Sequence, residues 1–296
     1  MLAVRGLRKT FGDYVAIRDV TFDVPSGAMV GFLGSNGAGK TTTMRMIMGI
    51  MEPDRGEVLF DGEPITRDQR AQIGYMPEER GLYPKQNLEG QLAYLAELKG
   101  VPRRRAVKDA RDYLDRFGLG DRRKDLLESL SLGNQQRVQI IASIMSQPNC
   151  LVLDEPFSGL DPKAIDDMSE VLRDVTRQGV PVLFSSHQLD MVDRLCDEMV
   201  ALSGGEVKAA GDLESLTRGR PLRYRAVLRP TDWPGRIDGV QVIEHVQSGD
   251  HDIAIFETHD PGAAHRLMRD GVQKDVIVEF SRVVPTLSEI YQEVVS

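Results

Sequence analysis

The chain has 296 residues, of which 41% are hydrophobic and 28% are charged, a composition typical of folded globular proteins. Its formal net charge of −8 argues against nucleic acid as the principal ligand. The sequence contains neither an apolar run of about eighteen residues nor an amino-terminal secretory signal. Its two cysteines, Cys150 and Cys196, are too far apart for a CxxC pair. We therefore expect a cytoplasmic protein with reduced cysteines, which reaches a membrane only through a partner.

The first part of the chain alternates short apolar runs with helical patterns. Residues 28–34, 150–155 and 180–186 read as buried strands, each followed by a loop and a helical pattern. Between residues 87 and 147 the apolar positions instead recur every three to four residues. The sequence thus predicts a largely parallel sheet covered by helices, with a helical subdomain inserted at about 87–147.

The pattern changes again near Pro221. Residues 223–229, 240–246, 251–257 and 275–280 resemble short strands joined by Gly and Asp turns, with one helical stretch near Pro261. We therefore predict two domains, a nucleotide-binding domain at 1–219 and a small α+β accessory domain at 220–296. The sequence suggests no mechanism for the second domain.

A phosphate-binding loop is predicted at residues 34–41, where GSNGAGKT matches the pattern GxxxxGK[ST] between an apolar strand and a helical pattern. Glycines let successive backbone N–H groups surround phosphate oxygens, and the following helix directs its positive end at the same anions. Lys40 would neutralise the β- and γ-phosphates, and the Thr41 hydroxyl would bind Mg²⁺. The predicted nucleotide-binding residues here are Gly34, Ser35, Asn36, Gly37, Ala38, Gly39, Lys40, Thr41 and Thr42.

The apolar strand at residues 150–155, CLVLDE, ends in two carboxylates. Asp154 is placed to hold Mg²⁺ directly or through water, and Glu155 to polarise an attacking water. Such a pair alone often begins a solvated loop. Together with the phosphate loop, it predicts a nucleotide hydrolysis site.

Residues 130–137, LSLGNQQR, resemble the LSGGQ signature of the ABC ATPase family. In that family two nucleotide domains pair head to tail, and the signature of one domain completes the site of the other. The resemblance assigns γ-phosphate binding to Ser131, Gly133 and Asn134, at the amino terminus of a helix.

Further segments match the family in order. The resemblance implies that Phe11 stacks on adenine, with Tyr14 as the alternative, and that Asp161, in SGLD, lies where the paired domains contact each other. It also implies that His187, in FSSHQLD, contacts the γ-phosphate and the attacking water. Taken alone, His187 would more often be a structural residue.

Two segments depart from the family pattern. Glu78 stands where the family usually has Gln, and Leu132 and Asn134 stand where Gly and Gln are usual. Glu78 keeps an oxygen that can approach Mg²⁺, so we predict it as a metal ligand, with a solvated loop acid as the alternative. The signature keeps Ser131 and Gly133 and is therefore expected to remain competent.

The resemblance covers residues 2 to about 217 and implies an α/β fold, namely a P-loop NTPase ABC cassette with a mixed sheet and a helical subdomain, followed by the small α+β domain. It also implies ATP and Mg²⁺ as ligands. The implied partners are a second copy of the chain and integral-membrane permease subunits at the inner face of the cell membrane. The segments at 74–84, 130–137 and 154–162 are similar to those of bacterial sodium- and drug-export ATPases.

Two other functions remain open at this stage. One is a soluble ABC protein of translation or DNA maintenance, although neither a second cassette nor a long coiled coil is visible. The other is a regulatory cassette that binds ATP without hydrolysing it, which Glu78 keeps open. The transported substrate is not encoded here, because its contacts lie in the permease.

Overall fold

The computed structural model describes residues 1–79, 81–231, 233 and 237–295. The chain forms two compact units. Unit 1 consists of Met1–Leu213 and Leu287–Ser296, and unit 2 of Glu214–Thr286. Among the described residues, no helix combines the length and apolar character needed to cross a bilayer.

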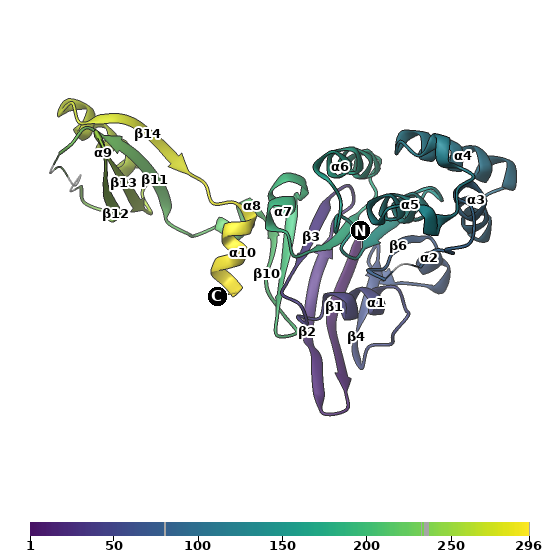
Figure 1. The fold of residues 1–296 in the computed structure, drawn as a ribbon. Coiled ribbons are helices and arrows are strands. Elements are labelled where there is room, and N and C mark those ends of the chain that lie inside the picture. Colours follow the sequence, from purple (N-terminus) through teal and green to yellow (C-terminus); the bar gives the residue numbers. More distant parts are fainter. Residues whose placement is uncertain (80, 232, 234–236, 296) are drawn as a thin grey trace. The chain divides into compact units, whose positions relative to one another are not determined.

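Unit 1 is built on a ten-stranded sheet with the order β5-β4-β1-β2-β10-β9-β3-β8-β7-β6 (Figure 1). Strands β6, β7, β8, β3 and β9 pair in parallel, whereas β1 is antiparallel to both β2 and β4. All residues of β3, β7 and β8 are buried, as expected for parallel strands covered by helices on both faces. The strands are β1 (Leu2–Phe11), β2 (Tyr14–Val24), β3 (Met29–Leu33), β4 (Arg55–Phe60), β5 (Glu63–Pro64), β6 (Ile73–Met76), β7 (Cys150–Leu153), β8 (Val182–Ser186), β9 (Glu198–Ser203) and β10 (Glu206–Asp212).

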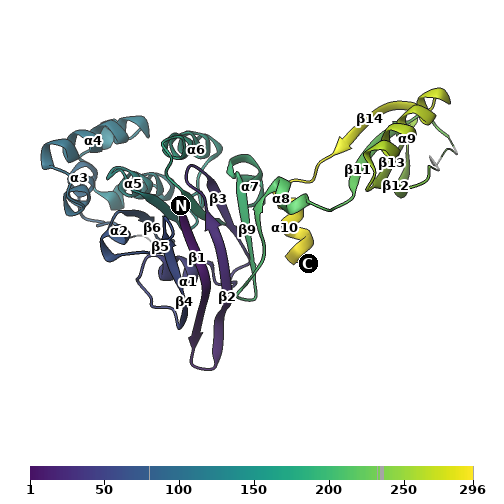
Figure 2. The ribbon, with the colours of Figure 1, turned by 180° about the vertical axis from the view of Figure 1, so that it is seen from behind.

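Helices α3 and α6 of unit 1 each begin after a residue whose side chain accepts a hydrogen bond from an N–H group of the first turn. The Asn87 side chain accepts a hydrogen bond from the Gly90 N–H at the start of α3, and Asp161 accepts one from Ala164 at the start of α6. Helices α3, α4 and α5 lie side by side and share one apolar core with α6 (Figure 2). The helices are α1 (Lys40–Ile47), α2 (Arg67–Ala71), α3 (Leu88–Leu98), α4 (Arg103–Arg116), α5 (Leu132–Ile144), α6 (Pro162–Arg177) and α7 (Leu189–Leu195), with 3-10 turns at Gly120–Arg122 and Leu127–Ser129.

Unit 2 contains a four-stranded antiparallel sheet of order β12-β13-β11-β14, in which β11 is Leu222–Leu228, β12 Gln241–Ser248, β13 His251–Thr258 and β14 Ile277–Val283. Helix α9 (Pro261–Gln273) contributes Leu267 to its core, which also holds Ala226, Phe256 and Trp233. The short α8 (Leu213–Thr217) precedes this sheet. Unit 2 therefore has its own small α+β core.

The last helix, α10 (Leu287–Val295), packs on α7 and β9 and belongs to unit 1. Leu287 and Ile290 are 6% and 0% exposed. The Ser288 N–H donates to Asp193 Oδ1 at 3.0 Å, and its hydroxyl donates to Oδ2. The division of the chain thus differs from the predicted one at residues 219/220, because unit 2 ends at Thr286 and the final segment returns to unit 1.

Candidate functional site

The phosphate loop joins β3 to α1. Gly37 and Gly39 have φ angles of 82° and 108°, in the left-handed region that favours glycine. A Cβ atom on Gly39 would lie 2.3 Å from Ile17 Cδ1, and one on Gly34 would lie 2.7 Å from the Leu202 carbonyl oxygen. These glycines therefore allow the loop to pack closely against the neighbouring strands while keeping the conformation that an anion-binding loop needs.

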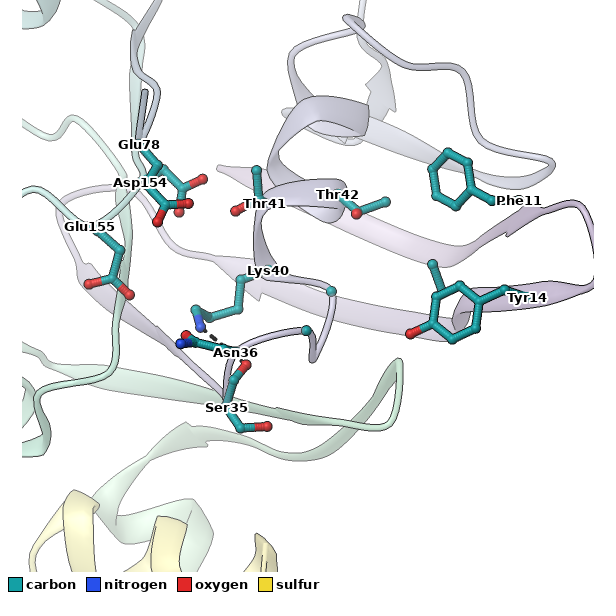
Figure 3. Close-up of a pocket in the computed structure, with 13 residues that line it drawn as sticks. Phe11, Tyr14, Ser35, Asn36, Lys40, Thr41, Thr42, Glu78, Asp154 and Glu155 are labelled. Carbon is teal, nitrogen blue, oxygen red and sulfur yellow. Dashed lines mark hydrogen bonds between the residues drawn. The ribbon is translucent and has the colours of Figure 1, made fainter. Parts of the chain in front are cut away.

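Lys40 is the first residue of α1 and is 7% exposed. Its ammonium group donates to the carbonyl oxygen of Gly34 at 2.7 Å. It also donates to that of Ser35 at 3.4 Å, the bond dashed in Figure 3. These contacts hold a positive charge against the loop, next to the positive end of the helix. Both charges favour an anion in the same place.

Together these elements line a cavity of about 420 Å³. Figure 3 shows the rings of Phe11 and Tyr14 at one end and the carboxylates of Glu78, Asp154 and Glu155 at the other, with the phosphate loop and α1 between them. The two rings are 46% and 63% exposed, so each has a face available for a planar ligand. The lining residues are Phe11, Tyr14, Ala16, Ser35, Asn36, Gly37, Gly39, Lys40, Thr41, Thr42, Glu78, Asp154 and Glu155.

Asp154 follows β7 and is 1% exposed. Its Oδ1 accepts a 2.6 Å hydrogen bond from the Ser185 hydroxyl, whereas its Oδ2 has no hydrogen-bond partner within the described part of the chain. Burial, and after it the negative charge of Asp154, raise the pKa of the Tyr75 hydroxyl. A buried carboxylate oxygen without a partner is costly unless a ligand compensates it, so this oxygen is suited to a cation.

Glu155 lies at the mouth of the cavity, beside His187. The backbone of Glu155 has φ 51°, which is uncommon for a residue other than glycine. Its N–H donates to Ser185 Oγ at 2.8 Å, and its carbonyl oxygen accepts from Gln136 Nε2 at 3.1 Å. Its Oε2 lies 2.9 Å from His187 Nδ1. A carboxylate and an imidazole in contact can exchange or hold a proton.

The first turn of α5 lies outside this cavity. Ser131 occupies the N-cap position, and among the described residues its side chain makes no capping hydrogen bond. The neighbouring Leu132 is 60% exposed. Asp161 also lies outside the cavity, where it caps α6 and approaches Arg137 at 4.0 Å.

Comparison with known proteins shows to which family the chain belongs. Residues 17–158 match the family model of the ABC transporter family. Over 218 residues the chain is 44% identical to YhaQ of Bacillus subtilis (strain 168), an uncharacterized ABC transporter ATP-binding protein, covering 74% of this chain and 73% of YhaQ. The chain belongs to the ABC transporter ATP-binding proteins. It is therefore an ATPase subunit of an ABC transporter.

Two other relatives of this ABC subunit have names that refer to different compounds. The linearmycin resistance ATP-binding protein LnrL of Bacillus subtilis (strain 168) is 33% identical, covering 71% of this chain and 69% of LnrL. The methionine import ATP-binding protein MetN of Corynebacterium jeikeium (strain K411) is 32% identical, covering 67% and 56%. The two names refer to different compounds, linearmycin and methionine, and only the name of MetN states a direction of transport, which is import.

A solved structure of the ATP-binding subunit of an ABC transporter superposes with a TM-score of 0.69 at 35% identity, covering 74% of this chain and 92% of that one. The predicted ABC cassette fold is thereby confirmed for unit 1, as is ATP as the ligand class.

The cavity fits the Mg²⁺ ion that accompanies ATP in this family. Thr41 and Glu78 line the same cavity as Asp154, whose Oδ2 has no hydrogen-bond partner among the described residues. Hydroxyl and carboxylate oxygens are suitable ligands for this hard cation, which usually takes one or two carboxylates and completes its shell with water and phosphate. Among the described residues, no three or more His, Cys, Asp or Glu side chains form a group that could hold a metal ion.

The structure brings most of the predicted site of this ABC subunit together. The lining residues include every predicted residue of the phosphate loop except Gly34 and Ala38, and His187 joins through Glu155. The cavity of one chain does not include Ser131, Gly133, Asn134 or Asp161. Sequence reasoning did not single out Ser185 and Gln136, which contact Glu155. For Ser185 the available signal was a polar residue in an otherwise apolar strand pattern.

Proposed function

We propose that the chain hydrolyses Mg-ATP in two sites shared head to tail between two copies. The observation that supports this most directly is the separation within one chain between a lined phosphate cavity and the uncapped, exposed first turn of α5. A helix amino terminus with open N–H groups binds anions, but that of α5 lies outside its own chain's cavity. A second copy is therefore required to bring Ser131, Gly133 and Asn134 to the γ-phosphate.

Each residue of the cavity then has a distinct role. Phe11 stacks on the adenine, while Lys40 and the loop N–H groups bind the phosphates. Thr41, Asp154 and Glu78 would hold Mg²⁺, which when bound would neutralise phosphate charge and polarise the γ-phosphate.

Glu155 is proposed as the general base that orients and deprotonates the attacking water. Its contact with His187, at 2.9 Å between Oε2 and Nδ1, keeps both groups at the same end of the cavity. His187 is then placed to contact the γ-phosphate once ATP is bound. Asp161 lies at the start of α6, where it would meet the other copy in the closed pair.

We further propose that a permease segment docks in a second cavity of unit 1, of about 410 Å³, between the β6 region and α3. Its lining is mainly apolar and includes Tyr75, Leu82 and the 64% exposed Leu98. Gln139 also lines it, is 4% exposed and has no hydrogen-bond partner for its amide among the described residues. Burial lowers the pKa of Lys99 in the same lining. A helix with apolar side chains and one polar group would satisfy this surface.

This docking would couple ATP binding to transport. The loop at residues 78–84 connects the Glu78 end of the first cavity to the second cavity, and within it Arg80 lies outside the described residues. Closure of the pair on ATP, which binds the closed state better, would move the docked permease, and hydrolysis would release it. The chain then works at the cytoplasmic face of a membrane. The likeness to LnrL and to export-type motifs supports export as the direction.

Substitution of Glu155 by Gln tests the catalytic assignment. The amide keeps the size of the side chain but not its basicity, so phosphate release should fall by about 10² to 10⁴ while ATP affinity stays within about twofold. The variant should accumulate as an ATP-bound dimer on a sizing column, because hydrolysis reopens the pair. Glu170→Gln, the same change at an exposed position of α6, is the matched control. Parental turnover without an ATP-dependent dimer in Glu155→Gln would rule out both the general base and the shared site.

A further inference from the structure

Ser185 is a fully buried serine near the carboxyl end of β8, two residues before His187. It follows the apolar residues Leu183 and Phe184 and is 0% exposed. A hydroxyl buried in such a strand is unfavourable unless it is hydrogen-bonded. Its two partners are the residues to which the hydrolytic chemistry is assigned.

The Ser185 hydroxyl donates one hydrogen bond and accepts another at the same time. It donates its proton to Asp154 Oδ1, at 2.6 Å, and accepts the backbone N–H of Glu155, at 2.8 Å. One hydroxyl has a single proton to donate and two lone pairs to accept with, so the two bonds are compatible. Because β7 and β8 pair in parallel, with Leu153 opposite Phe184, the next residues of the two strands meet at this point.

The bond to Asp154 determines which carboxylate oxygen remains available. Oδ1 is occupied by Ser185, while Oδ2 has no partner among the described residues, and Asp154 lines the phosphate cavity. Without the donor, both oxygens of a 1% exposed carboxylate would lack a partner among the described residues, and the carboxylate could rotate. The hydroxyl therefore fixes one oxygen and leaves the other for the cation.

The bond to Glu155 acts on the backbone. Glu155 has φ 51°, a conformation that a residue with a side chain adopts only when its surroundings enforce it. The Ser185 oxygen holds the N–H of this residue, and Gln136 holds its carbonyl oxygen at 3.1 Å. Held on both sides, the residue places its carboxylate 2.9 Å from His187.

We propose that Ser185 is a positioning residue of the ATPase site, which through one hydroxyl orients the metal-binding oxygen of Asp154 and the backbone that carries Glu155. This inference rests on the proposed roles of those two carboxylates. It assigns Ser185 no contact with ATP, so its loss should affect the response to metal and the rate of turnover more than nucleotide binding.

The test compares Ser185→Ala and Ser185→Cys with the parental chain in steady-state phosphate release, as a function of ATP and of free Mg²⁺. For Ser185→Ala, kcat should fall by about 10- to 100-fold, the effect of losing a hydrogen bond to a charged group. The free Mg²⁺ concentration for half-maximal rate should rise, and ATP affinity measured in EDTA should stay at the parental value. Cys fills a similar volume with a much weaker donor, so its defect should resemble that of Ala.

Ser169→Ala is the matched control. Ser169 is 3% exposed, and among the described residues its hydroxyl donates within α6, to the Ile165 carbonyl oxygen. This control should lose some stability but keep the parental kcat and Mg²⁺ dependence. If Ser185→Ala unfolds, the same measurements are made on Ser185→Cys, which changes the packing less.

The outcomes separate this inference from the function on which it rests. Parental kcat and Mg²⁺ dependence in a folded Ser185→Cys or Ser185→Ala chain, with Glu155→Gln inactive, would overturn the positioning role alone. Parental turnover in Glu155→Gln would overturn the proposed function itself. A raised Mg²⁺ requirement in the Ser185 variants but not in Ser169→Ala would support the inference.

Discussion

Two helix amino termini of unit 1, those of α1 and α5, offer the same kind of N–H groups to a phosphate but differ in their surroundings. Helix α1 begins inside a cavity, where Lys40 is 7% exposed and glycines with positive φ shape the preceding loop. Helix α5 begins at the surface, where Ser131 has an extended backbone and Leu132 is 60% exposed. Each first turn offers unpaired N–H groups. This difference supports the proposal that one chain carries two half-sites, of which the half at α5 serves another chain.

Loss of Lys40 should produce the largest effect and should act on only one half-site. In Lys40→Ala the triphosphate loses its principal cation, so ATP affinity should fall by about 100-fold or more. The fold should survive, because the alanine remains compatible with helix α1. Isothermal titration with Mg-ATP measures the loss, with the surface variant Lys208→Ala as the control. Unchanged ATP binding in Lys40→Ala would show that the loop at residues 34–41 is not the phosphate site.

A bulky cation at the other half-site should spare ATP binding and stop turnover. Because Ser131 does not line the cavity of its own chain, Ser131→Arg should bind ATP with parental affinity as a monomer. Its phosphate release should fall by about 100-fold, since the side chain would block the helix end that is proposed to contact the γ-phosphate in the other copy. Equal losses of binding and turnover would contradict the division into half-sites.

Mixing two inactive variants tests whether the two halves of one active site come from different chains. Lys40→Ala chains mixed with Ser131→Arg chains should recover about a quarter of the parental rate, because half of randomly formed dimers would hold one intact site out of two. Lys40→Ala mixed with Glu155→Gln should recover nothing, because Lys40 and Glu155 line one cavity of one chain. Recovery in the second mixture, or none in the first, would exclude the head-to-tail arrangement.

Removal of α10 should weaken both half-sites together, because it destabilises unit 1 as a whole. A chain ending at Thr286 loses the burial of Leu287 and Ile290, about 3 to 6 kcal/mol, and the bonds from Ser288 to Asp193. Unit 1 should therefore melt about 6 to 24 °C lower, as followed by circular dichroism.

The control for this truncation is internal. Trp233 is the single tryptophan of the sequence and lies in the core of unit 2, so its fluorescence follows that unit. Its transition should stay at the parental temperature. A lowered fluorescence transition with an unchanged unit 1 would assign α10 to unit 2.

The sequence predicted those parts of the fold and site that depend on contiguous residues. The phosphate loop and the Asp154–Glu155 pair were found because each is one segment with a fixed spacing, and the structure places both in one cavity. The role of Ser185 was missed because it depends on the pairing of β7 with β8, two segments that are distant in sequence. Helix α10 was not predicted at all, and an amphipathic pattern at its residues would not have specified which surface covers it.

Glu78 gives the smallest expected effect and tests whether the cavity is tuned by charge. It lines the acidic end of the cavity together with Asp154 and Glu155. In the absence of metal its carboxylate repels the phosphates, and a repulsion of about 1 kcal/mol corresponds to about fivefold in affinity. Glu78→Gln should therefore bind ATP about fivefold more tightly in EDTA, with a smaller gain at higher salt because exposed charges are screened. Adding Mg²⁺ should reduce the gain, because the parental carboxylate then also interacts with the cation.

Glu79→Gln, the same change at an exposed neighbour outside the cavity, should leave both affinities unchanged. Equal behaviour of the two variants would return Glu78 to the role of a solvated loop acid.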